Sequence, residues 1–287
     1  MWLIFSILSS AALMVIFKVF ARFEIRVFPS IVVNYITCFV LGNLLLGKQN
    51  IVSQAVWEQH WFPFVAGMGL LFISAFYLMG LGTGLAGAGA TSVAAKMSVV
   101  IPAAVSMLLF HEKPGLFILL GMLLSVFSVY LMRPENNDGS GSRGLWVLLL
   151  VFIGSGMVDT GLNLVKHQFG HVVDDYTIST VVFGSAGVIG LILMLSQKGQ
   201  FPKRKEILGG IVLGCANYAS LIAMFGAIGA YKGHTAWFFA VNNIGVVWVS
   251  TFISILFFKE KISKAGYVGL ILAALAVLLM NIHAFFG

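Results

Sequence analysis

The sequence predicts an all-α polytopic membrane protein, and two observations carry that prediction: its composition and the length of its apolar runs. Of the 287 residues, 60% are hydrophobic and only 9% are Asp, Glu, Lys or Arg. A soluble protein contains about 25% charged residues, because polar groups must cover its surface. The apolar runs reach the roughly 20 residues with which a helix crosses about 30 Å of hydrocarbon. The length of the chain therefore indicates how many membrane spans it can form, rather than how many soluble domains.

Ten apolar segments separated by short polar turns are expected to be transmembrane helices. The first begins at residue 1 without a basic region or a small-residue cleavage site, which favours a first span over a removable signal peptide. Cys38 and Cys215 lie within apolar segments and form no disulfide or metal-binding pattern. The expected helices cover residues 2–20, 28–47, 61–80, 87–110, 114–132, 144–165, 176–196, 207–230, 234–258 and 262–285.

A polar segment divides the chain into two halves. Residues 133–143 are rich in Gly, Ser and Asn and are expected to form a flexible linker. Five predicted helices precede it, in residues 1–132, and five follow it, in residues 144–287. Each half is thus a five-helix unit.

The basic residues predict the orientation of these helices. The formal net charge is +7, but its Lys and Arg residues are spread over short loops rather than gathered in a patch for nucleic acid. One side of the membrane receives twelve of them and the other side four, with Lys96 inside a span. The twelve are Lys18, Arg22, Arg26, Arg133, Arg143, Lys198, Lys203, Arg204, Lys205, Lys259, Lys261 and Lys264, and the four are Lys48, Lys113, Lys166 and Lys232. Because basic loops stay in the cytoplasm, both termini are predicted to lie outside.

The two halves carry an internal repeat. At an offset of 254 − 106 = 148 residues, residues 106–132 match residues 254–280 at ten of 27 ungapped positions, and the same offset relates Lys18 to Lys166. The identical positions are Ser106, Leu108, Phe110, Glu112, Lys113, Gly121, Leu124, Val129, Leu131 and Met132. Because each half has an odd number of spans, the second half must be inverted relative to the first. Inverted repeats are typical of secondary transporters that work by alternating access.

These repeated residues resemble the EamA family of the drug/metabolite transporter superfamily. In each half an apolar helix runs into Phe-(His/Lys)-Glu-Lys and then into a Gly-containing helix, at residues 110–121 and 258–269. The resemblance covers nearly the whole chain and implies a ten-helix transporter of the inner membrane, with export of a small metabolite as its expected activity. Two features depart from the pattern: Ser250 stands where the first half has Pro102, and no basic tail follows the last helix.

Lys96 lies in the apolar stretch "TSVAAKMSVVIPAA", residues 91–104. A charge inside a span costs about 2.5 to 3.5 kcal/mol and by default marks a pathway or a binding site. Lys96 is nine residues from the expected start of its helix, which corresponds to a depth of about 14 Å at 1.5 Å per residue. Either it faces a central cavity, where it binds an anionic group or exchanges a proton, or it forms a fixed ion pair.

Asp159 is the expected partner of Lys96, because it is the only acidic residue within a predicted span. Asp159, Asn163 and Lys166 are spaced i, i+4 and i+7, which places them on one helix face. A permanent pair between Lys96 and Asp159 is the structural alternative to a binding or translocation role.

Further polar side chains within spans could line the same path. Hydrogen bonding between helices is the alternative for each of them, and Trp237 could instead anchor its helix at the membrane interface. The candidates are Asn34, Tyr35, Asn217, Tyr218, His234, Trp237, Asn242 and Asn243.

Two motifs near helix ends are interpreted as structural. The glycine-rich residues 80–90 lack the Gly-Lys-Ser/Thr ending of a phosphate-binding loop and are expected to allow close packing and a hinge. Glu112 and Glu260 are expected to cap the following helix or to pair with Lys113 and Lys261.

A secondary transporter is the function that these features favour, with an integral membrane enzyme or a channel or receptor as alternatives. An enzyme would need clustered ligands, and only "KHQFGHVVDD", with His167 and His171, offers them. We interpret that stretch as a solvated turn and expect no metal, no cofactor and no enzymatic activity. The expected partners are a small-molecule substrate and the lipid bilayer, but no nucleic acid, for a monomer or homodimer. No nucleotide-binding motif is present in the sequence, so transport would run on a substrate or ion gradient.

Overall fold

The computed structural model of the protein describes residues 1–46, 51, 56–110, 114–134, 140–196, 201–231 and 234–282. Within these ranges the chain is helical and contains no strand. Glu112, Lys113, Lys48, Lys198 and Lys232 lie outside the described residues. The helices are α1 (Trp2–Arg22), α2 (Val27–Leu46), η2 (Val56–Glu58), α3 (Phe62–Leu85), α4 (Ala88–Met97), α5 (Val100–Phe110), α6 (Leu116–Leu131), α7 (Ser140–Phe169), α8 (Asp175–Ser196), α9 (Arg204–Ala230), α10 (Thr235–Phe258) and α11 (Lys264–Met280).

Eight of the described segments are long and apolar enough to cross a membrane, which confirms a polytopic membrane protein. The segment Ala88–Leu109, made of α4 and α5, is one of them. The two remaining apolar helices, α6 and α11, have 16 and 17 residues.

The expected helix over residues 87–110 is interrupted, because α4 ends at Met97 and α5 begins at Val100. Pro102 explains the break: it has no N–H to donate to the carbonyl of Ser98, and its ring would collide with that carbonyl in a continuous helix. The corresponding residue of α10 is Ser250, and α10 runs without interruption. A second boundary also differs, because α7 begins at Ser140, inside the segment expected to be a linker, while residues 135–139 lie outside the described part of the chain.

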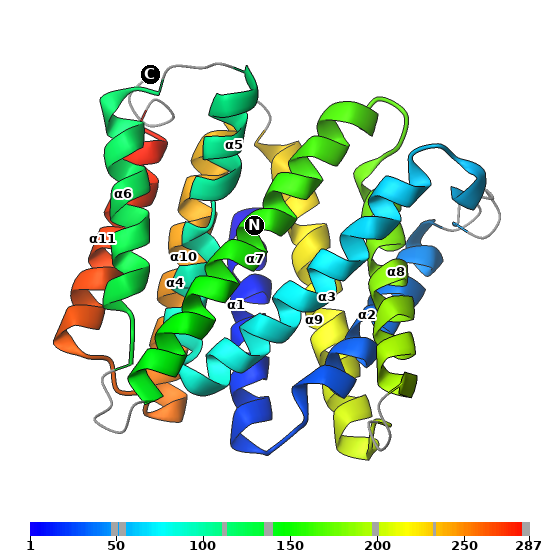
Figure 1. The fold of residues 1–287 in the computed structure, drawn as a ribbon, viewed down its shortest axis with the longest axis horizontal. Coiled ribbons are helices and arrows are strands. Elements are labelled where there is room, and N and C mark those ends of the chain that lie inside the picture. Colours follow the sequence, from blue (N-terminus) through cyan, green and yellow to red (C-terminus); the bar gives the residue numbers. More distant parts are fainter. Residues whose placement is uncertain are drawn as a thin grey trace.

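The helices pack into two groups, which Figure 1 shows side by side. The α2 group contains α1, α2, α3, α7, α8 and α9, which pack on one another in a continuous series, and the α10 group contains α4, α6, α10 and α11. We count α5 with the α10 group because it follows α4 directly along the chain, although it packs on α7. Four helices of the α2 group also contact the α10 group: α1 packs on α4 and α10, α3 packs on α4, α7 packs on α4, α5 and α6, and α9 touches α10. In Figure 1 the α1–α2, α3–α4 and α10–α11 turns lie at the end that we call the lower end.

Glycines allow close packing between corresponding helices of the two halves. A Cβ on Gly121 of α6 would overlap Ala276 and Met280 of α11, and a Cβ on Gly269 of α11 would meet Ser128 and Met132 of α6. These contacts are reciprocal at the offset of 148 residues, since 121 + 148 = 269, 128 + 148 = 276 and 132 + 148 = 280. Each glycine near the start of one helix faces the end of the other, so α6 and α11 are antiparallel.

The pair α2 and α8 shows the same relation. Gly42, late in α2, faces Thr180, early in α8, and Gly190, late in α8, faces Val32, early in α2. The offset is again 148 residues, since 42 + 148 = 190 and 32 + 148 = 180.

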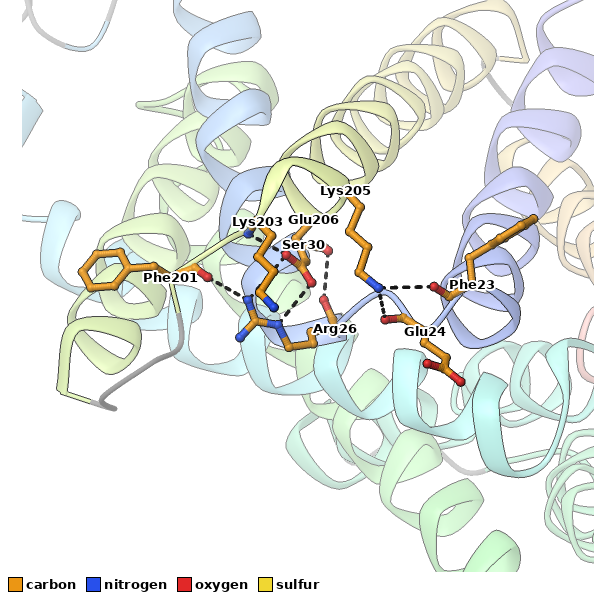
Figure 2. Close-up of polar contacts among 8 residues, drawn as sticks. All are labelled: Phe23, Glu24, Arg26, Ser30, Phe201, Lys203, Lys205 and Glu206. Carbon is orange, nitrogen blue, oxygen red and sulfur yellow. Dashed lines mark hydrogen bonds and ion pairs between the residues drawn. The ribbon is translucent and has the colours of Figure 1, made fainter.

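A charge network around the buried Glu206 carboxylate fixes the turn between α1 and α2 against α9 (Figure 2). Arg26 donates from Nε to Oε1 of the fully buried Glu206 at 3.1 Å and from Nη2 to the Phe201 carbonyl at 2.7 Å. Glu206 also accepts from the backbone N–H of Lys203, at the start of α9. Lys205 donates to the Glu24 carbonyl at 2.8 Å. Because every partner lies in the α2 group, the network holds that group together at its lower end.

Candidate functional site

Lys96 lies at the C-terminal end of α4, one residue before the helix ends. The last carbonyl groups of a helix have no N–H partner within it and carry partial negative charge, which stabilises a nearby cation. The break caused by Pro102 therefore makes the interior position less costly for Lys96 than the middle of a continuous helix. Its side chain is half-buried, whereas Ala94, Ala95 and Met97 are buried.

Asp159 lies within α7, and its side chain is exposed. The face that it shares with Asn163 and Lys166 is accessible over its length, because Asn163 is also exposed and Lys166 is half-buried. Lys166 pairs with Asp175 at 2.9 Å and lies over the ring of Phe225. The helix itself is held to its neighbours by small residues, since a Cβ on Gly156 would overlap Ile101 of α5.

Lys96 and Asp159 interact electrostatically across the contact between α4 and α7. They do not touch: among the ion pairs of the described residues, with nitrogen and oxygen within 4 Å, none joins these two side chains. In this structure, then, the permanent pair considered from the sequence is absent. A cation of the first half and an anion of the second thus lie on packed helices without neutralising each other by direct contact.

Asn34 and Asn217 bridge two helices. Asn217 Nδ2 donates to Asn34 Oδ1 at 3.3 Å between α9 and α2, and both side chains are buried. Cys38 donates from Sγ to the Gly214 carbonyl at 3.4 Å in the same contact. Tyr35 is also buried, and its hydroxyl donates to the Phe72 carbonyl at 2.8 Å. For Asn34, Tyr35 and Asn217 the structure favours the helix-bridging alternative.

The remaining predicted residues fall into two places. Tyr218 packs on Phe183 with a buried hydroxyl that has no hydrogen-bond partner. His234 directly precedes the first turn of α10 and is exposed. Trp237, in that first turn, is half-buried against Tyr231, with 5.7 Å between the ring centroids.

A series of unpaired polar groups follows the contacts among α1, α4 and α10, which pack on one another. Asn242 of α10 is buried with Oδ1 unpaired, and Asn243 beside it is half-buried. Four hydroxyls are also buried without a partner, and sequence reasoning missed them: Ser6 of α1, Ser92 of α4, and Thr251 and Ser254 of α10. The hydroxyls of Ser and Thr commonly donate to a backbone carbonyl of their own helix, so these residue types do not by themselves indicate a position along a transport path.

The described residues contain no group of three or more His, Cys, Asp or Glu that could hold a metal ion. His167 belongs to the last turn of α7, which extends to Phe169, and His171 lies in the turn that follows. Asp174 caps α8 instead, because its carboxylate accepts from the backbone N–H groups of Tyr176 and Thr177.

Comparisons with known proteins find a relative of similar sequence and a solved structure of similar fold. No family model matches the chain. An uncharacterized protein of Haemophilus influenzae (strain ATCC 51907 / DSM 11121 / KW20 / Rd) is 27% identical over 281 residues, which are 96% of this chain and 95% of that protein. A protein of known crystal structure, described without a function, superposes with a TM-score of 0.58 at 15% identity, over 97% of this chain and 98% of the other. The chain thus shares its overall fold with that solved structure.

Proposed function

We propose that the protein is a secondary transporter of a small metabolite, similar to the EamA family of the drug/metabolite transporter superfamily, which works by alternating access in the inner membrane. One observation carries the proposal: Lys96 and Asp159, from different halves of the chain, interact across the α4–α7 contact without forming an ion pair. Unpaired charges inside membrane-spanning helices are costly, and by default they mark a ligand site or an ion pathway.

The packing of corresponding helices supports two inverted repeats. Reciprocal glycine contacts relate α6 to α11 and α2 to α8 at the sequence offset of 148 residues, and in each pair the helices are antiparallel. Helices α6 and α11 are about 24 to 26 Å long at 1.5 Å per residue, so flanking residues would complete two further spans. On this proposal the eight long segments, α6 and α11 make ten spans, in repeats of residues 1–132 and 144–287 joined by a linker.

The substrate would bind between the two helix groups near Lys96. An ammonium group favours a carboxylate or another anionic group, so a small metabolite with a carboxylate suits the site. Asp159 would carry a proton or balance the charge of Lys96 when the substrate leaves. Transport in the export direction would then run on a proton gradient or on exchange, with the lower end of Figure 1 in the cytoplasm and both termini outside.

Transport of a panel of small metabolites by proteoliposomes would test the proposal. For a carried compound we expect saturable uptake and counterflow, and a loss of about ten-fold or more in Lys96→Ala, because contacts to charged groups are worth about 1.5 to 3 kcal/mol. Lys96→Arg keeps the charge but changes its shape and should retain part of the activity. Lys264→Met, which removes an exposed cation at the start of α11, is the matched control and should transport normally.

Two outcomes would contradict the proposal. Flux without saturation or counterflow would indicate a channel. Full transport in Lys96→Ala, at equal amounts of inserted protein, would remove Lys96 from the site.

A further inference from the structure

Lys18 and Glu260 join the two helix groups at the lower end of the molecule. Lys18 Nζ lies 3.0 Å from Glu260 Oε1, and the side chains are only 20% and 14% exposed. Lys18 belongs to α1 of the α2 group, whereas Glu260 lies in the turn between α10 and α11 of the α10 group. The sequence predicted a partner for Glu260 within its own turn, Lys261, but the partner is 242 residues away in the chain.

The Glu260 carboxylate lies against the start of α4. Gly87 precedes α4 with a φ of 96°, and a Cβ at this position would overlap the Glu260 carboxylate. Only glycine adopts this φ readily and leaves room for the carboxylate. The free N–H groups at a helix start carry partial positive charge, which stabilises a carboxylate there. The carboxylate thus lies against the α10 group and reaches Lys18 on the α2 group through Oε1, while Oε2 is buried without a hydrogen-bond partner.

Other ion pairs lie within one helix group. Lys166, which corresponds to Lys18 in the repeat, pairs with Asp175, and both residues lie in α7 and α8 of the α2 group. Arg26 and Glu206 also belong to that group. The Lys18–Glu260 pair therefore differs from both, since it alone of the three connects helices of different groups.

The exposure of polar side chains also differs between the two ends of the molecule. Asp159 and Asn163, in the later part of α7 and away from the lower end, are exposed. Thr251 and Ser254, in the part of α10 that approaches the lower end, are buried. A cavity of about 370 Å³ is lined by Glu260, Lys261 and Arg133 among others.

We propose that the Lys18–Glu260 ion pair is a gate that closes the lower end of the transport path, and that it breaks when the path opens to that side. The inference rests on the proposed function, since a gate needs two alternating states. The structure then represents the state closed at the lower end, and the cavity beside Glu260 is the vestibule outside the gate. A partly buried ion pair between two groups of helices can be made in one state and broken in the other, like the interface contacts that separate alternate states.

Labelling of a single cysteine would test the gate without a known substrate. We choose Thr251→Cys as the reporter, because Thr251 is buried at the α4–α10 contact and cysteine is close to its size. Cys38 and Cys215 are first replaced by Ala. Vesicles of known orientation are treated with a membrane-impermeant maleimide from the side of the lower end. The gate variants are Lys18→Met and Glu260→Gln, with Lys264→Met as the control.

Each gate variant is expected to raise the labelling rate about five-fold or more, the usual lower range for coupling between two states. The double variant should label no faster than the faster single variant, because both changes remove one contact. Lys264→Met should label as the parent does. A second reporter, Asn163→Cys labelled from the opposite side, should lose accessibility in the gate variants and covers the case in which Thr251→Cys does not fold.

Unchanged labelling of both reporters in the two gate variants would overturn the gate and leave the proposed transport intact. Equal increases at both reporters would also overturn it, because they indicate general loosening rather than exchange between states. Loss of transport in Lys96→Ala is measured separately, so the gate and the binding site can fail independently.

Discussion

At the scale of single residues, Asn217 tests whether buried polar groups serve structure or transport. Its hydrogen bond to Asn34 joins α9 to α2, and both side chains are buried. We expect Asn217→Ala to lower the free energy of unfolding by about 0.6 to 2 kcal/mol, the measured range for such bonds in membranes. Transport should persist.

The measurement is thermal unfolding in detergent together with transport in proteoliposomes. Asn243→Ala is the control, because Asn243 is half-buried and should change stability less. Abolished transport with unchanged stability in Asn217→Ala would return Asn217 to the path.

The residue types alone could not separate Asn217 from Asn242. Both are asparagines in apolar helices, and the sequence predicted a lining role or a helix-bridging role for each. The difference arises from the neighbour: Asn34 faces Asn217, whereas Asn242 Oδ1 is buried without a partner. Which side chains meet depends on packing between segments about 180 residues apart, and periodicity along one helix does not determine it.

At the scale of helices, most expected helices match helices of the structure, and the differences have local causes. The break between α4 and α5 follows from Pro102, which the sequence displayed but whose effect in a long apolar run depends on the surrounding helices. The end of α7 at Phe169 and its start at Ser140 extend the expected helix over residues 144–165. Polar residues at membrane surfaces can continue a helix beyond the apolar segment, so hydropathy underestimates its length.

The reciprocal glycines of α6 and α11 give a prediction for that helix pair. A Cβ on Gly121 would lie 2.8 Å from the Ala276 carbonyl, and a Cβ on Gly269 would lie 3.0 Å from the Ser128 carbonyl. Because backbone must move in both cases, Gly121→Ala and Gly269→Ala should each destabilise the protein by about 1 to 3 kcal/mol.

Thermal unfolding of the two glycine variants should give similar shifts, since the contacts are equivalent. Gly67→Ala is the matched control: no atom lies within 4 Å of its Cβ, and alanine is the better helix former by about 1 kcal/mol. Stability equal to or above that of the parent in both glycine variants would show that α6 and α11 do not pack at this distance.

At the scale of the whole molecule, the proposed inverted arrangement fixes where the linker between the halves lies. Ten spans return the chain to the side of the membrane on which it began. Eight spans, with α6 and α11 outside the bilayer, would do the same, but they would put the linker between the halves on the side of the termini. The linker therefore distinguishes the two arrangements. With five spans before it, residues 133–143 must lie opposite the termini.

We expect a reporter inserted after Gly139 to lie on the cytoplasmic side and reporters at Met1 and Gly287 to lie outside. The reason is the distribution of Lys and Arg, of which twelve fall on the side of the linker and four on the other. Paired fusions to an enzyme active only in the cytoplasm and to one active only outside would measure this. A control insertion after Lys203, in the loop before α9, should report the same side as the linker. A linker on the same side as the termini would require an even number of spans in each half, and the halves could then not be inverted copies of one another.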